Sequence, residues 1–225
     1  MHHSEKMFGL ALHTSTPELG LAISDFDTVH RHQTWALGRD LSSQLHALLQ
    51  EFLAPQNWQD LSFIVVCIGP GGFTGTRIGV ATARTLAQQL DIPLLGISAL
   101  AAAAYHRIIG CNQTSELKAS QTKQVATDIA VTMPAKREAV YGAIYHWNGE
   151  TLHPKLSDVV LSANDWSAKQ TQWSQPLIQI TLESGIGLAD TTLSLLKLGY
   201  DQWQTAKYPS WREITPFYGQ HPVNL

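Results

Sequence analysis

The sequence has few cysteines, few charges and no long apolar run, and each shortage excludes a class of protein. Its two cysteines, Cys67 and Cys111, lie far apart and match no metal or redox spacing. The longest mostly apolar run, residues 92–105, is shorter than the roughly 20 residues that span a bilayer. Charged residues make up 15% of the chain, and the net charge of −3 gives no overall basicity that would indicate nucleic-acid binding. We therefore expect a soluble, cytoplasmic protein without a membrane partner.

The apolar pattern predicts an α/β protein with two lobes. Strands are expected at residues 7–13, 18–26, 28–35, 63–68 and 93–97, and helices at 41–53, 74–90 and 98–106. Asp40 is the predicted N-cap of the first helix. A strand meander followed by alternating strands and helices indicates a mixed sheet flanked by helices. The first six residues are left out of this prediction.

The predicted lobe boundary lies in the polar stretch 110–124, whose composition suits a linker. This boundary gives an N-terminal lobe of residues 7–109 and a C-terminal lobe of residues 110–225, whose final residues can pack back on the first lobe. In the second lobe, strands are expected at 125–133, 139–147 and 176–182, and a helix at 188–198. The Asn148-Gly149 pair predicts a hairpin turn.

The glycine-rich stretch "GPGGFTGTRIG" (69–79) follows an apolar run, as a phosphate-binding loop does. It is not a Walker loop, because Gly75 is followed by Thr76 and Arg77 rather than by lysine. The dinucleotide fingerprint fails as well, because Thr74 stands where its third glycine belongs. The free N–H groups of a helix N-terminus still permit weak binding of an anion or nucleotide. The candidate residues for such a site are Thr14, Ser15, Gly71 and Gly72.

Small residues recur every fourth position along the helix expected at 74–90. They are Gly75, Gly79, Ala83 and Ala87. A glycine inside a helix costs about 1 kcal/mol relative to alanine, so Gly79 indicates that something approaches the backbone closely. Either the sheet of the same lobe packs on this face or a helix of another chain docks there. Apolar residues on the other faces can serve the core, which favours docking, and Gly79→Leu should then abolish partner binding in a folded protein.

Two segments resemble the TsaB (YeaZ) family over about 100 residues: "LALHTSTPELGLAI" (10–23) and "GPGGFTGTRIGVATARTLAQQLDIPLLGISALAA" (69–102). Weaker similarities follow in "AKREAVYGAIY" (135–145) and "EITPFY" (213–218). The resemblance implies a two-lobed actin-like ATPase (ASKHA) fold with mixed sheets flanked by helices. It implies a noncatalytic subunit of the bacterial machinery that makes N6-threonylcarbamoyladenosine (t6A) at position 37 of tRNA.

The family's partners are the transferase TsaD, in a heterodimer, and the ATPase TsaE. The resemblance implies that this chain contacts tRNA only indirectly, through the complex. It also implies that the chain alone binds no cofactor and that ATP and magnesium can bind at the level of the complex. When the chain is alone, its unoccupied apolar helix pair would allow a homodimer, but the sequence does not decide whether one forms.

The heterodimer interface maps onto residues 40–53 and 74–90. The expected partner-binding residues are Ser42, His46, Leu49, Phe73, Thr74, Gly75, Arg77, Ile78, Gly79, Ala83 and Arg84. Arg77 and Arg84 lie seven residues apart and therefore on about the same helix face, where they can pair with partner carboxylates or with phosphate.

The sequence departs from the family pattern where catalysis would need an acid. Relatives commonly read "DTST" after the first strand, whereas here His13 precedes the threonine. A neutral imidazole offers neither the charge nor the hard oxygen that magnesium favours. None of the ten histidines lies four residues from another, so the paired-histidine metal motif is absent. The alternative function is an autonomous ATP-dependent phosphotransferase or carbamoyltransferase, which would require nucleotide affinity in the isolated chain.

Overall fold

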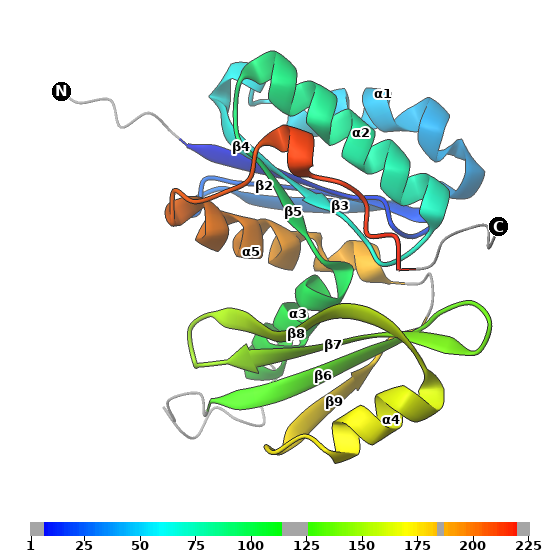
Figure 1. The fold of residues 1–225 in the computed structure, drawn as a ribbon. Coiled ribbons are helices and arrows are strands. Elements are labelled where there is room, and N and C mark those ends of the chain that lie inside the picture. Colours follow the sequence, from blue (N-terminus) through cyan, green and yellow to red (C-terminus); the bar gives the residue numbers. More distant parts are fainter. Residues whose placement is uncertain (1–6, 114–125, 184–186, 220–225) are drawn as a thin grey trace. The chain divides into compact units, whose positions relative to one another are not determined.

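The computed structural model describes residues 7–113, 126–183 and 187–219, which form two compact units (Figure 1). Unit 1 contains the described residues up to Ala99 together with 187–216, and unit 2 contains the others. The sequence placed the boundary at residue 110, but helix α3 (Ala99–Gln113) continues through Gly110. The rest of the expected linker, residues 114–124, lies outside the described residues. Residues 187–216 belong to unit 1 because their helix packs on its sheet.

Unit 1 is built on a five-stranded mixed sheet in the order β3-β2-β1-β4-β5. The strands are β1 (Phe8–His13), β2 (Glu18–Ser24), β3 (His30–Ala36), β4 (Leu61–Cys67) and β5 (Leu94–Ile97). The first three form an antiparallel meander, and β4 pairs in parallel with both β1 and β5. The apolar runs of β1 and β4 fit this position because central strands with both faces covered are buried throughout.

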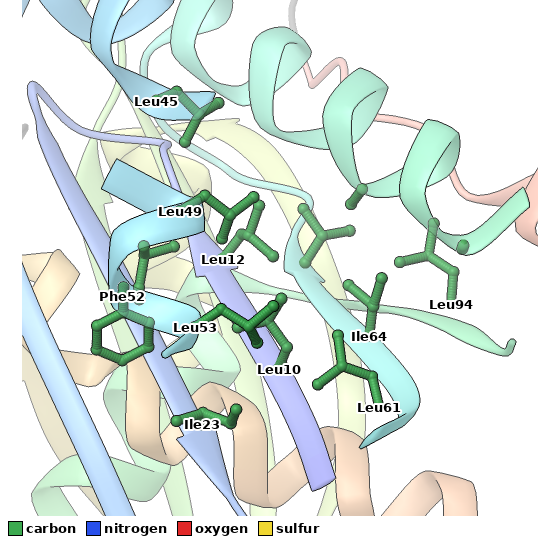
Figure 2. Packing of buried hydrophobic residues seen from close by; sticks show 14 of the residues in the cluster. Leu10, Leu12, Ile23, Leu45, Leu49, Phe52, Leu53, Leu61, Ile64 and Leu94 are labelled. Carbon is green, nitrogen blue, oxygen red and sulfur yellow. The ribbon is translucent and has the colours of Figure 1, made fainter. Parts of the chain in front are cut away.

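Helices α1 (Leu41–Leu53) and α2 (Phe73–Leu90) cover one face of this sheet (Figure 1). In α1, Leu45, Leu49 and Leu53 recur every four residues and therefore share the face that packs on β1 (Figure 2). Burial of each such leucine stabilises the fold by roughly 1.5–3 kcal/mol. Asp40 occupies the predicted N-cap position, but its side chain makes no capping hydrogen bond, because its backbone continues the helical turn of η1 (Gly38–Asp40).

Helix α5 (Thr192–Gln204) covers the opposite face of the sheet, directly after the short helix η3 (Leu188–Thr191). Gly199 allows close approach, because a Cβ at this position would lie 2.3 Å from Val65 Cγ2. The ring of Phe63 on β4 stacks with Trp203 on α5, with centroids 5.0 Å apart. The two faces of the sheet are therefore both closed by helices of the same unit.

Unit 2 contains a four-stranded sheet in the order β8-β7-β6-β9. The strands are β6 (Thr127–Pro134), β7 (Ala139–Trp147), β8 (Leu152–Ser162) and β9 (Leu177–Thr181). The pairing of β6 with β7 and the turn at Asn148-Gly149 are confirmed. Strand β8 and helix α4 (Ala163–Thr171) were not predicted, because β8 mixes polar and apolar residues and α4 buries only Trp166. Within the described parts of the chain, none of the helices has the length and apolarity needed to cross a lipid bilayer.

Candidate partner-binding surface and the loop beneath it

The loop that follows β1 lies directly beneath the start of α2. Thr14 and Ser15 are fully buried, and the backbone N–H of Gly72 donates to the carbonyl of Ser15 at 2.6 Å. A Cβ added at Gly71 would lie 2.2 Å from the Ser15 carbonyl oxygen, and one at Gly75 would lie 2.2 Å from that of Thr14. Only glycine permits such close backbone approach. These glycines therefore make room for the chain's own loop.

The small-residue face of α2 also packs within unit 1. A Cβ at Gly79 would lie 2.0 Å from Thr14 Oγ1, and Ala83 is fully buried in the cluster between helix and sheet. This supports the alternative left open by the sequence, that the same unit packs on this face. Gly79 and Ala83 are buried there and are no surface contacts, whereas Gly75 is half-buried and its contact with a partner stays a prediction. Leu49 is only 2% exposed in the same cluster, so it is no surface contact either. Gly79→Leu is consequently expected to disturb the fold, contrary to the prediction from sequence.

The other predicted partner-binding residues lie on the outward side of the two helices. We call their surface the helix-pair face: Ser42, His46, Phe73, Thr74, Arg77 and Ile78. Ile78 is half-buried and the rest are exposed. A Leu41 methyl group lies 3.5 Å from where a Gly75 Cβ would stand, which brings the starts of α1 and α2 together. The two helix segments that carry these residues therefore begin close together.

Two side chains dominate the α2 part of this face. The Phe73 ring is 46% exposed, and the Arg77 guanidinium lies over it, 5.1 Å from the ring centroid. Arg84 lies apart from this pair, because its guanidinium sits over the ring of Trp211 at 5.7 Å. The two arginines predicted to act together thus have different aromatic partners.

The residues proposed for an anion site come together, but their hydroxyl groups are engaged. Thr14 Oγ1 donates to the Gly75 carbonyl at 2.9 Å, and Ser15 Oγ donates to Cys67 Sγ at 3.2 Å. Cys67 is buried, as the sequence indicated. Gly71 and Gly72 are exposed, yet the N–H of Gly72 is bound to Ser15. The loop thus directs these donors at protein atoms rather than at a ligand.

His13, at the end of β1, does not fit the magnesium site of actin-like ATPases. Its side chain is fully buried, and neither ring nitrogen has a hydrogen-bond partner within the described residues. Burial lowers the pKa of His13 from 6.5 to about 4. The imidazole is therefore neutral near pH 7 and provides neither the oxygen ligand nor the negative charge that magnesium favours.

Unit 2 holds a polar network that the sequence analysis missed. Asp128 on β6 lies 2.6 Å from His146 Nδ1 and accepts a 2.9 Å hydrogen bond from Trp173 Nε1. Burial alone would raise the pKa of Asp128, but hydrogen bonds from Trp173 and His146 and the charges of His146 and Lys155 outweigh it and hold the pKa below its ordinary value. An aspartate inside the apolar strand "VATDIAVTM" was the available signal. In the described residues, no three His, Cys, Asp or Glu side chains gather as metal ligands.

Comparisons with known proteins agree with this architecture. A family model described as "TsaD: tRNA N6-adenosine threonylcarbamoyltransferase" matches residues 36–183. The tRNA threonylcarbamoyladenosine biosynthesis protein TsaB of Bacillus subtilis is 32% identical over 174 residues, which cover 75% of this chain and 68% of that protein. The chain belongs to the TsaB (YeaZ) family.

Other members of the family extend the comparison. TsaB of Escherichia coli is 26% identical over 195 residues, covering 80% of this chain and 78% of its own length. The structure of YeaZ from Pseudomonas aeruginosa superposes with a TM-score of 0.70 at 20% identity and covers 94% of this chain and all of that one. The TsaB fold is thus present, with two mixed sheets and flanking helices, which confirms the actin-like ATPase fold expected from the sequence.

Proposed function

We propose that this chain is a subunit of the machinery that forms N6-threonylcarbamoyladenosine in tRNA, and that it binds a TsaD-class catalytic partner through its helix-pair face. The names of its TsaB relatives support the pathway. The choice of a TsaD-class partner rests on the family resemblance, which implies that TsaB proteins pair with TsaD. The match to the TsaD family model adds that this chain is itself similar to that family.

One observation carries the choice of surface: an aromatic ring and an arginine are exposed together on helices whose inner sides are already filled. Phe73 and Arg77 lie together at the start of α2, which is close to the start of α1. Aromatic and arginine side chains supply much of the binding energy at protein interfaces, whereas scattered polar residues supply little. The glycines at the start of α2 pack closely against the loop after β1, so Phe73 is presented on a rigid support.

In this proposal the chain contributes binding rather than chemistry. His13 is buried and neutral at the position where actin-like ATPases hold magnesium through an acid. The hydroxyl groups of Thr14 and Ser15 form hydrogen bonds within the protein. ATP and magnesium then belong to the assembled complex, together with the TsaE-class ATPase. The transferase reaction takes place in the TsaD-class partner.

Light scattering on a size-exclusion column, with the chain mixed with TsaD from the same organism, tests the proposal. Phe73→Ser should weaken the one-to-one complex at least about 10-fold, because an interface loses a central aromatic anchor. Ile178→Ser is the matched control, since Ile178 is a 52% exposed apolar side chain on β9 of unit 2. Both positions are exposed, so neither substitution should change stability by more than about 0.5 kcal/mol.

A charge reversal on the same face gives a second comparison. Arg77→Glu should also weaken the complex, whereas Arg39→Glu, the same change in the exposed η1, should not. Wild-type affinity in both Phe73→Ser and Arg77→Glu would contradict the choice of surface. Steady ATP hydrolysis by the isolated chain would contradict the noncatalytic role.

A further inference from the structure

The segment that follows α5 forms a second surface rich in cations and aromatic rings. We call it the basic ledge: Lys207, Tyr208, Trp211 and Arg212, together with Arg84 of α2. The short helix η4 (Trp211–Glu213) lies against α2, where the final red part of the ribbon runs beside that helix (Figure 1). The ledge thus joins residues more than 120 positions apart in the sequence and lies wholly within unit 1.

The backbone of the ledge is held in place from both sides. Ser210 and Glu213 form a capping box around η4, in which the Ser210 N–H donates to Glu213 Oε1 at 3.2 Å. Ile214, directly after η4, is buried, and its Cγ2 lies 3.1 Å from where a Gly96 Cβ would stand. Trp211 itself packs on the core of unit 1. The side chains of Trp211 and Arg212 therefore project from a fixed support.

Two guanidinium groups share the ring of Trp211. The Cζ atoms of Arg84 and Arg212 lie 5.7 Å and 5.1 Å from its centroid. Within the described residues, neither arginine forms an ion pair with a carboxylate, and the nearby Glu213 is engaged in the capping box. Like charges held together without a counter-charge favour binding of an anion. This concentration of positive charge contrasts with the chain's net charge of −3.

The chemistry of the ledge fits RNA better than a protein carboxylate. The planar guanidinium group of arginine can bind a phosphate through two hydrogen bonds at once. Lys207, close by in the sequence, adds an exposed cation. The Tyr208 ring is 39% exposed, and exposed aromatic rings are the surfaces on which unpaired RNA bases stack. We propose that the basic ledge binds RNA directly, with Arg84 and Arg212 on backbone phosphates and Tyr208 against an unpaired base. The inference rests on the proposed role in tRNA modification and adds a direct RNA contact to it.

The test measures binding of a fluorescently labelled RNA hairpin with an anticodon-type loop to the full chain by anisotropy, at several salt concentrations. Arg84→Gln/Arg212→Gln should lower the slope of log K against log salt by about 1.4, because each phosphate contact on single-stranded RNA contributes about 0.7. The matched control is Arg39→Gln/Arg107→Gln, which removes the same charge from two exposed arginines outside the ledge. That control should leave the slope within about 0.3 of wild type.

A second variant separates stacking from charge. Tyr208→Ala should weaken RNA binding about fivefold or more without changing the salt slope, because a stacking contact involves no ion release. Equal loss of affinity in the two arginine pairs would overturn the proposal, since binding would then follow net charge alone. The proposal would also be overturned if the wild-type chain bound the hairpin with no higher affinity than the Arg84→Gln/Arg212→Gln variant.

Light scattering with TsaD keeps this inference distinct from the proposed function. The Tyr208→Ala variant should form the complex with unchanged affinity, because Phe73, Arg77 and Arg84 are retained. Loss of the complex with RNA binding unchanged would identify the ledge as a protein contact instead, and competition by free ATP but not by RNA would identify a nucleotide site. Either result would overturn the RNA assignment, whereas the test of the helix-pair face by Phe73→Ser would remain valid.

Discussion

Replacing Gly79 by alanine tests whether packing within unit 1 explains the small residues of α2. Gly79 lies inside the helix, and an added Cβ would stand 2.0 Å from Thr14 Oγ1 and 3.2 Å from Thr14 Cβ. Thr14 is fully buried, and its hydroxyl group donates to the Gly75 carbonyl at 2.9 Å. The oxygen atom cannot move aside without losing that hydrogen bond, so the methyl group meets an occupied site.

Three terms set the size of the effect. Alanine gains about 1 kcal/mol over glycine in a helix interior. Against this stand the lost Thr14 hydrogen bond, worth about 0.5–1.5 kcal/mol, and the strain of an overpacked site, typically about 1–3 kcal/mol. We therefore expect Gly79→Ala to lower the free energy of unfolding by about 1–3 kcal/mol.

A double-mutant cycle with Thr14→Ala isolates the contact. Without the threonine hydroxyl group, Gly79→Ala should be neutral or stabilising by up to about 1 kcal/mol, because the helix propensity is then opposed only by the 3.2 Å approach to the Cβ of residue 14. Urea unfolding of the four proteins measures the change in free energy, with the slope m as a check on two-state behaviour. Ala81→Gly at an exposed position of α2 reports the propensity term alone.

Two results would refute this account. Stabilisation of the otherwise unchanged protein by Gly79→Ala would show that Thr14 does not fill the space. Unchanged stability together with loss of the TsaD complex would restore the interpretation that a partner helix docks on the small-residue face.

Two further predictions concern the buried ionisable groups. His13 stays neutral in the folded chain down to a pKa of about 4, whereas the unfolded chain takes up the proton near pH 6.5, so stability falls as the pH drops through this interval, by about 3 kcal/mol in total. Urea titrations at pH 7, 6 and 5 should show this loss, and His13→Leu should remove most of it; an equal loss in the variant would assign it to other groups. Asp128→Asn should destabilise the chain at pH 7 by about 1–3 kcal/mol, because an amide carries no charge and its NH2 group can bond His146 Nδ1 only when that nitrogen bears no proton. Since the pKa of Asp128 is lowered by folding, its stabilisation is present above the unfolded pKa and lost at acid pH, so the difference between variant and wild type should shrink there.

Local periodicity was enough to predict most of unit 1. The leucines of α1 recur at the spacing of one helix face, and the apolar runs of β1 and β4 are long enough for central strands. Such patterns depend on residues close in sequence. Helix α4 was not predicted because it is short and mostly polar. Its one buried residue, Trp166, donates a hydrogen bond to the Thr132 hydroxyl group, a contact that the local pattern does not reveal.

The candidate site could be predicted only in part, for a related reason. A stripe of small residues shows that something packs closely against α2, but the sequence does not say whether it belongs to the same chain. The answer depends on where Thr14 lies in space, 65 residues before Gly79. The ledge was missed because Arg84 and Trp211 become neighbours only through the fold. Exposed partner residues such as Phe73 came from the family resemblance rather than from the pattern.

The closely packed glycines and the proposed partner residues of α2 are nevertheless connected. Close packing of Gly71, Gly75 and Gly79 on the loop after β1 fixes the direction of the helix, and this direction decides where Phe73 and Arg77 point. A surface held rigidly loses little conformational entropy on binding, so part of its affinity comes from the packing beneath it. A glycine variant can therefore weaken the complex without touching the partner, whereas Phe73→Ser should do so at unchanged stability. Measuring unfolding and complex formation on the same variants distinguishes a residue that makes the contact from one that positions it.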